Sequence, residues 1–309
     1  MTKLKRTKLL RINPKCPWNS LQRIPWNRHK VLLLTLLTIS LQCYAQDSYM
    51  NLVERAVTAT QHDSILFAEE LYQKALRQDP SNPKNALIYT NLGKIQERLG
   101  RNQEALANYD KALEIFPSTT IFLRSRADLY LRIGMYQSAI SDYEKIIYKQ
   151  ELNRSKSDSA INALLGYAYT RLMKYDKAKK YIKKALAVES DNYMALLGNT
   201  IILQQTGKPQ EANTQLESLI SQYPDKAEPY ALRAENEQKQ QFYELALMDI
   251  SKAIHLDPSN SHYLLTRADI HYQSKQYKSA LADYLEAVRL GIPRTAVNDK
   301  IQKCRKNIQ

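Results

Sequence analysis

The same pattern of apolar and polar residues repeats several times along the chain. The stretches 125–147, 232–254 and 266–288 align without gaps, and each has Arg-Ala near its start and a central Ala followed three residues later by Asp. Apolar residues within each stretch recur at intervals of three and four, which is the spacing of one helix face. The pattern therefore predicts pairs of amphipathic helices.

The period of the pattern is set by the central alanines. They are Ala68, Ala105, Ala139, Ala178, Ala212, Ala246 and Ala280, and their separations are 37, 34, 39, 34, 34 and 34 residues. A nearly constant period of this length indicates a repeat protein in which each unit buries its apolar face against its neighbours.

Other positions keep their character when the central Ala is numbered 20. Position 8 is small: Ala56, Gly93, Ala127, Gly166, Ala234 and Ala268, with Thr200 as the exception. Position 24 is large: Tyr72, Tyr109, Tyr143, Ile182, Leu216, Ile250 and Tyr284. Small residues at 8 and 20 let two helices approach closely, and position 24 fills the space between them.

These features resemble the tetratricopeptide repeat family, whose unit is a 34-residue helix–turn–helix. The resemblance covers 49–294 and implies an all-α, right-handed superhelical solenoid of seven repeats. Their expected ranges are 49–82, 86–119, 120–153, 159–192, 193–226, 227–260 and 261–294. Apolar residues recur at helical spacing within 295–309, which predicts a C-terminal capping helix with Cys304 on its buried side.

Two spacings are irregular. Three extra residues lie within 79–85, and five lie within 149–159. The second segment is polar, which predicts a longer loop or a helix extension. It is not expected to be a domain boundary, because the repeat resumes at once.

Asp at position 23 occurs only in repeats that have Arg at position 7, although the first repeat breaks the pattern with Arg55 and Leu71. The pairs are Arg126 with Asp142, Arg233 with Asp249, and Arg267 with Asp283, while the fifth repeat has Asn199 with Gln215. Since a guanidinium can bind a carboxylate in two places, we expect an Arg–Asp bridge between the two helices of a repeat. Asp283→Ala is then expected to lower thermal stability, and Arg267→Leu to restore part of it.

Position 11 of the seventh repeat is His271, which is expected to be a structural histidine. His62, His255 and His262 are equally isolated, so no metal site is predicted. The sequence has no Gly-rich phosphate loop, no CxxC and no nucleophile elbow. The repeats consume the length of the chain, so we expect neither a cofactor nor an enzyme.

Positions 2, 9 and 13 of each first helix face away from the core, and in this family that face lines the groove that holds partners. The candidate partner-binding residues on this face are Arg98, Arg132, Arg171, Tyr167, Met194 and Ile201, and Arg124 and Leu197 lie beside it at position 5. One interpretation is a groove with an apolar floor and a cationic wall that accepts an acidic peptide. The other interpretation is that the arginines solvate a helix face and the apolar residues close a tight superhelix.

The family's carboxylate clamp for chaperone C-termini is not reproduced. It would need a Lys/Asn/Asn/Lys/Arg set in three successive repeats, and in repeats one to three only Asn91 matches. Repeats two to four also lack this set of residues.

The net charge of +14 does not indicate a nucleic-acid partner. Nine of these cations lie within residues 1–45 without any acid, so the remainder carries only +5. The same segment ends in the apolar run 31–41, which is too short to span a bilayer, and it predicts an export signal cleaved after Ala45. Lipidation at Cys43 and retention as an anchor remain open.

The sequence therefore predicts an exported, periplasmic or envelope scaffold of a bacterium that binds a protein or peptide partner non-covalently. The alternative is a structural accessory subunit of an envelope transport or polysaccharide-assembly complex.

Overall fold

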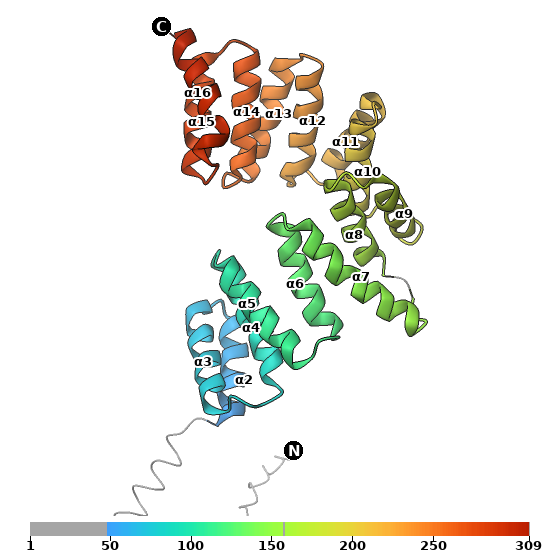
Figure 1. The fold of residues 1–309 in the computed structure, drawn as a ribbon, viewed down its shortest axis with the longest axis vertical. Coiled ribbons are helices and arrows are strands. Elements are labelled where there is room, and N and C mark those ends of the chain that lie inside the picture. Colours follow the sequence, from blue (N-terminus) through green and yellow to red (C-terminus); the bar gives the residue numbers. More distant parts are fainter. Residues whose placement is uncertain (1–47, 157, 309) are drawn as a thin grey trace, which may run out of the picture. The chain divides into compact units, whose positions relative to one another are not determined.

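The computed structural model describes residues 48–156 and 158–308, and the predicted export signal at 1–45 lies outside the described residues. Within the described ranges the chain forms fifteen α-helices and no strand, which confirms the all-α repeat fold (Figure 1). No helix of the described part combines the length and apolar character needed to cross a membrane.

Fourteen of the helices form seven consecutive pairs. The first helices are α2 (Tyr49–Gln61), α4 (Asn85–Arg98), α6 (Thr120–Arg132), α8 (Ser159–Arg171), α10 (Tyr193–Gln205), α12 (Ala227–Lys239) and α14 (Ser261–Gln273). The second helices are α3 (Ile65–Gln78), α5 (Asn102–Ile115), α7 (Tyr136–Leu152), α9 (Tyr175–Leu186), α11 (Pro209–Gln222), α13 (Tyr243–Leu256) and α15 (Tyr277–Arg289). Helix α16 (Arg294–Ile308) follows the last pair.

The chain divides between Asn82 and Pro83 into two compact units. The first unit contains α2 and α3, which pack against each other, and the second contains α4 to α16. The division falls in the first irregular spacing. At the second one, α7 continues to Leu152, so the predicted extension of a helix is confirmed.

The turn inside every repeat has one left-handed residue, at position 15. Three of the seven are glycines, Gly100, Gly134 and Gly207, and the others are Asp63, Met173, Gln241 and Lys275, with φ between 57° and 79°. Glycine adopts this conformation without steric cost, whereas other L residues rarely do. A single left-handed residue lets the second helix fold back against the first.

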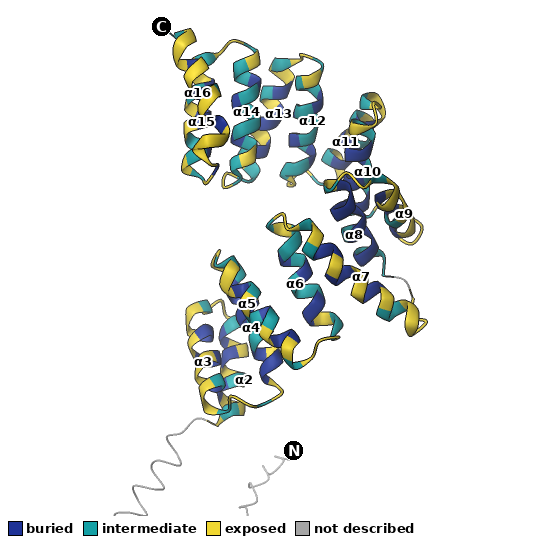
Figure 2. Cartoon of the chain, viewed as in Figure 1, coloured by how far each residue is buried: buried dark blue, intermediate teal, exposed yellow. Residues whose placement is uncertain are grey.

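The predicted contact between positions 8 and 24 holds the two helices of a repeat together. A Cβ added to Gly93 would lie 2.5 Å from Tyr109 Cε1, and one added to Gly166 would lie 2.8 Å from Ile182 Cγ1. In the fifth repeat Thr200 fits because its hydroxyl donates to the Leu196 carbonyl and to Gln215 Oε1, at 2.9 and 2.8 Å. Side chains at positions 20 and 24 are buried throughout (Figure 2).

The three predicted Arg–Asp bridges are present, and each uses two nitrogens of the guanidinium. Arg126 Nε and Nη2 lie 2.7 and 2.9 Å from the two carboxylate oxygens of Asp142. Arg233 bonds Asp249, and Arg267 bonds Asp283, with the same geometry. In the fifth repeat Asn199 Nδ2 donates to Gln215 Oε1 over 3.2 Å, so an amide pair replaces the ion pair.

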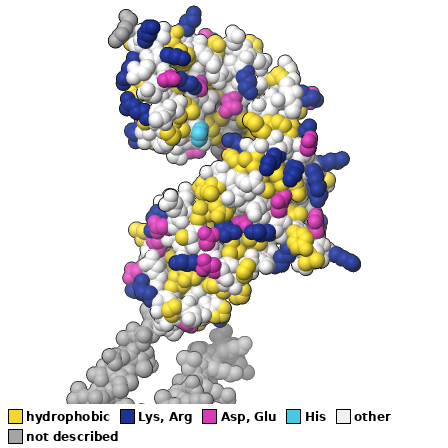
Figure 3. All heavy atoms as spheres, in the orientation of Figure 1, with side chains coloured by type: hydrophobic (Ala, Val, Ile, Leu, Met, Phe, Trp, Pro, Cys, Tyr) yellow, Lys and Arg dark blue, Asp and Glu magenta, His cyan; other side chains and the backbone are white. Residues whose placement is uncertain are grey.

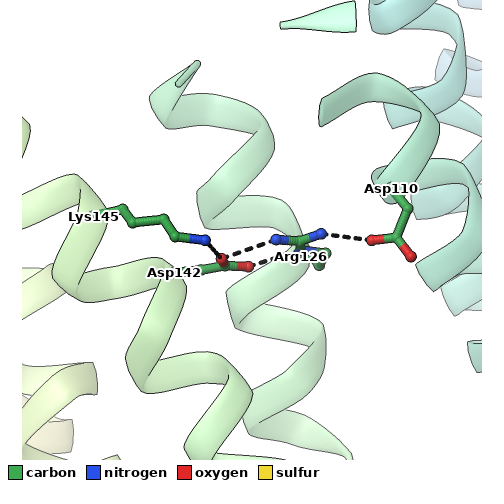
Figure 4. A network of polar contacts seen from close by, with 4 residues as sticks. All are labelled: Asp110, Arg126, Asp142 and Lys145. Atoms are coloured by element: carbon green, nitrogen blue, oxygen red, sulfur yellow. Dashed lines mark hydrogen bonds and ion pairs between the residues drawn. The ribbon is translucent and has the colours of Figure 1, made fainter. Parts of the chain in front are cut away.

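The bridge in the third repeat extends to its neighbour. Arg126 Nη1 also donates to Asp110 of α5 over 2.6 Å, and Lys145 lies 3.2 Å from Asp142 (Figure 4). The side chain of Asp142 is 3% exposed. This network therefore ties the second repeat to the third as well as α6 to α7.

The residues at position 11 lie beside the bridges. His271 contacts Gln276 through Nδ1 at 2.8 Å, and its Nε2 lies 3.8 Å from Asp283, so its role as a structural histidine is confirmed. The sixth repeat has Glu237 at this place. Burial, together with the nearby charge of Asp249, raises the pKa of Glu237 from 4.5 to about 7.

The raised pKa of Glu237 predicts a pH dependence of stability. The folded chain holds this proton up to about pH 7 but the unfolded chain only to 4.5, so the contribution is complete below pH 4.5 and is lost as pH rises through 7. Because water still reaches part of the side chain, we expect a loss of ~1–2 kcal/mol. Glu237→Gln should flatten the fall of Tm between pH 5 and 8, measured by circular dichroism. The exposed Glu244→Gln is the control, and equal slopes for wild type and Glu237→Gln would contradict the assignment.

Helix α16 covers the end of the last repeat. Val297, Ile301 and Cys304 are buried against α15 and its neighbours, so Cys304 packs as a small apolar residue as predicted. Ala296, one of the apolar residues within 295–309, is exposed. Lys300 Nζ also lies 2.6 Å from Asp269 of α14.

Candidate functional site

The candidate site is the surface formed by positions 2, 9 and 13 of the first helices in the second unit, which we call the inner face. Contacts join first helices of successive repeats: α4 with α6, α8 with α10, α10 with α12, and α12 with α14. Positions 2, 9 and 13 lie within ~40° of one another around a helix of 3.6 residues per turn. They therefore form one stripe along each first helix.

The inner face is open over α4 and α6. The α4 stripe consists of Leu87, Lys94 and Arg98, and all three side chains are exposed. On α6, Ile121 and Arg132 are exposed at the ends of the stripe. Leu87 is 55% exposed and Ile121 53%, so two large aliphatic side chains face solvent beside cations.

The arginines of the open half differ in their partners. Arg132 forms an ion pair with Glu97 of α4 and keeps 55% of its side chain exposed. Arg124 lies 3.7 Å from Asp128 and 3.8 Å from Asp158, which are loose contacts. The cationic wall expected here is therefore a row of unequal cations, of which Arg132 is held in place by Glu97 of the preceding repeat.

The inner face is closed over α8 and α10. Tyr167, Leu197 and Ile201 are 5%, 0% and 9% exposed and pack with Leu219, while Met194 is partly buried against them. Figure 2 shows α8 as one of the most deeply buried helices. These three side chains are therefore buried by internal packing, and the expected apolar floor is not open to solvent at them.

A polar cluster from three first helices closes this half. Tyr167 of α8 donates to Glu228 Oε1 of α12 over 3.1 Å, and Tyr193 of α10 donates to Glu228 Oε2 over 3.4 Å. Burial, reinforced by the charge of Glu228, raises the pKa of both tyrosines, so both hydroxyls remain donors. One carboxylate therefore joins α8 to α12 across α10.

Arg171, the last residue of α8, lies beside this cluster. Its guanidinium stacks over the rings of Tyr136 and Tyr167, 5.4 and 6.0 Å from their centroids, and Nη1 lies 3.4 Å from the Tyr167 hydroxyl. Such cation–π contacts fix the orientation of a side chain that would otherwise be mobile. Arg171 remains exposed, so it is an oriented cation at the edge of the closed half.

Sequence reasoning missed the acids of the closed half and the aliphatic residues of the open half. Glu228 and Glu235 occupy positions 2 and 9 of the sixth repeat, and Leu87 and Ile121 occupy position 2 of the second and third repeats. The same numbering that selected the arginines would have selected these residues. Burial raises the pKa of Glu235, while Lys239 and Arg171 oppose the shift.

Within the described part of the chain, no group of three or more His, Cys, Asp or Glu could hold a metal ion. Two depressions of the described chain, with volumes of about 350 and 310 Å³, lie between α15 and α16 and between α7 and α9, away from the inner face. The inner face offers charge and exposed apolar area, which suit non-covalent recognition.

Comparison with known proteins agrees with a helical repeat protein. Family profiles described as tetratricopeptide repeat match residues 52–118, 170–235, and 90–155 together with 231–294. The chain belongs to the tetratricopeptide repeat family.

The solved structures that match share this fold. A tetratricopeptide repeat protein from Parabacteroides merdae superposes with a TM-score of 0.69 at 26% identity, over 84% of this chain and 100% of that one. The Cut9–Hcn1 hetero-tetramer of the APC/C gives a TM-score of 0.57 at 15% identity, over 82% of this chain and 55% of that one. The second likeness concerns the fold alone.

Curated relatives are longer proteins. Hsp70-Hsp90 organizing protein 1 of Glycine max is 25% identical over 236 residues, which are 65% of this chain and 41% of that protein. DnaJ homolog subfamily C member 7 of Homo sapiens is 32% identical over 117 residues, 38% of this chain and 22% of that protein. This chain thus spans less than half the length of these relatives.

Proposed function

We propose that the chain is a non-covalent scaffold that binds a polypeptide partner through the open half of the inner face, on α4 and α6. The observation that carries this proposal is the contrast between the two halves. Internal packing buries Tyr167, Leu197 and Ile201. By contrast, the neighbouring stripes of α4 and α6 expose two aliphatic side chains and three cations, which are Leu87, Ile121, Lys94, Arg98 and Arg132.

The chemistry of the open half defines the partner. Two aliphatic side chains flanked by cations suit a segment in which large apolar residues alternate with acids. Burying the aliphatic pair supplies affinity, and the cations select an acidic partner and speed its approach. The proposed partner is therefore an acidic, partly apolar peptide or protein surface.

We further propose that binding takes place in a bacterial cell envelope. Support comes from the sequence of residues 1–45, in which nine cations precede an apolar run of eleven residues at 31–41. The scaffold would then hold its partner near other envelope components. No chemical step is assigned to it.

Co-purification from envelope extracts of the native host tests the proposal. Arg98→Gln/Arg132→Gln is expected to weaken capture of the partner at least tenfold, since two cations of the open half are lost. Lys252→Gln/Lys278→Gln removes the same charge from exposed second-helix positions and should leave capture unchanged.

Two results would contradict this proposal. Equal capture by both double variants would remove the inner face from the interaction and would favour an accessory subunit that assembles through its outer surfaces. Recovery of the chain and its partner from the cytosolic fraction alone would contradict the envelope location.

A further inference from the structure

The second helix of the fourth repeat differs in charge from every other second helix. Helix α9 has five lysines and one acid, Asp176. Each of the other six second helices has at least as many Asp and Glu as Lys and Arg. Solubility alone does not require such a concentration of lysines, because the neighbouring second helices, α7 and α11, lack it.

The lysines lie on the outward side of α9. Ala178, Ile182 and Ala185 face the core and are buried. The five lysines, Lys177, Lys179, Lys180, Lys183 and Lys184, cover the remaining surface and are all exposed. Figure 3 shows the resulting concentration of Lys and Arg side chains over this helix.

Most of this charge is not neutralised within the protein. Lys184 lies 3.7 Å from Glu151, but Lys179, Lys180 and Lys183 form no salt bridge with any described residue. Lys179 and Lys183, and Lys180 and Lys184, stand four residues apart, and like charges at this spacing destabilise a helix. The lysines of α9 therefore repel one another, and an external anion bound beside them would reduce this repulsion.

Apolar and aromatic side chains border the lysines. Met173 precedes α9 and Val188 follows it, and they are 70% and 51% exposed. The last turns of α7, joined to α9 through the Lys184–Glu151 pair, add Tyr148 and Leu152, which are 69% and 70% exposed. The lysines are thus bordered by exposed apolar side chains that are able to enter the headgroup region of a bilayer.

We propose that the outward side of α9, together with the end of α7, binds the surface of an anionic phospholipid bilayer. A cluster of lysines on one helix face is attracted by the negative surface potential of such membranes. A planar bilayer can meet the whole outward side of a second helix at once, and the exposed apolar side chains around the lysines favour lipid over a purely polar polyanion. The surface is separate from the inner face, so a partner and a membrane can be bound together.

Lysine footprinting of the full chain tests this proposal locally. Reductive methylation is measured with vesicles of phosphatidylcholine alone and of phosphatidylcholine with 30% phosphatidylglycerol. A local readout is needed because the cations of residues 1–45 also attract anionic vesicles. Protection of Lys179, Lys180 and Lys183 by the anionic vesicles only, with Lys252 and Lys278 still reactive, is the expected result.

Two triple variants measure how much the α9 lysines contribute to the affinity for anionic vesicles. Lys179→Gln/Lys180→Gln/Lys183→Gln should reduce the affinity of the α9 surface for anionic vesicles roughly 100-fold, and Lys252→Gln/Lys278→Gln/Lys303→Gln should change it little. The α9 variant is expected to fold normally, because it removes like-charge repulsion. If this variant does not fold, the lysine protection pattern of the unaltered chain tests the proposal by itself.

Three results would overturn the proposal. The first is equal protection by neutral and anionic vesicles. The second is protection spread evenly over lysines of all second helices. The third is protection of α9 by polyglutamate or RNA at matched charge but not by anionic vesicles, which would assign the surface to an acidic protein or a nucleic acid instead.

Discussion

Arg126→Asn is expected to lower the free energy of unfolding by about 3 kcal/mol, because it leaves the carboxylate of Asp142 buried without its main partner. The side chain of Asp142 is 3% exposed, and among the described residues Lys145, at 3.2 Å, is the one cation that would still pair with it. Urea denaturation followed by circular dichroism measures the change.

The fifth repeat shows which pair of residues can replace both partners of the Arg126–Asp142 bridge. Asn199 and Gln215 occupy the equivalent positions and hydrogen-bond each other at 3.2 Å. Arg126→Asn/Asp142→Gln reproduces this pair and should recover at least half of the loss, since no charge is then left buried. Strict additivity of the two single changes would contradict a direct bridge.

The same cycle in the seventh repeat should give a smaller effect. Arg267 and Asp283 are 26% and 11% exposed, compared with 18% and 3% for Arg126 and Asp142. Water therefore screens the seventh bridge more than the third.

Tyr143→Ala is expected to cost about 4 kcal/mol, because it removes a fully buried aromatic ring from the contact between the two helices of a repeat. Tyr143 is 0% exposed, and its hydroxyl donates to Asp128 Oδ1 over 2.6 Å. Tyr143→Phe keeps the ring and removes only the hydrogen bond, at a cost of about 1 kcal/mol. Thermal and urea unfolding measure both changes.

The control for Tyr143 lies on the same helix. Tyr148, five residues further along α7, is 69% exposed, so Tyr148→Ala should change stability by less than about 0.5 kcal/mol. Comparable losses for Tyr143→Ala and Tyr148→Ala would show that position 24 is not the packing position that the repeat assigns to it.

Most of the fold could be predicted because the determining contacts lie within one repeat. Gly93 and Tyr109, or Arg267 and Asp283, are sixteen residues apart in the sequence, so a regular pattern places both partners without knowledge of the rest of the chain. Each such contact recurs in several repeats, and that recurrence separates it from chance.

The candidate site was harder to predict because its decisive contact is long-range. Tyr167 and Glu228 lie 61 residues apart, and their hydrogen bond joins α8 to α12 across an intervening repeat. The periodic pattern gives the stripe to which each residue belongs. It does not give how closely α8, α10 and α12 approach, and that approach decides whether Leu197 and Ile201 are buried or open. Leu87 and Ile121 both occupy position 2, so the repeat numbering places them on the inner face, but it does not show that their side chains are exposed.

Site-specific photo-crosslinking in the native host tests the central claim most directly. A photoreactive amino acid at position 121, in the open half of the inner face, should yield one discrete crosslinked polypeptide. The same group at position 248, where Met248 is 70% exposed on α13, should yield none. Identical products from both positions, or no product from position 121, would contradict binding at the inner face of α4 and α6.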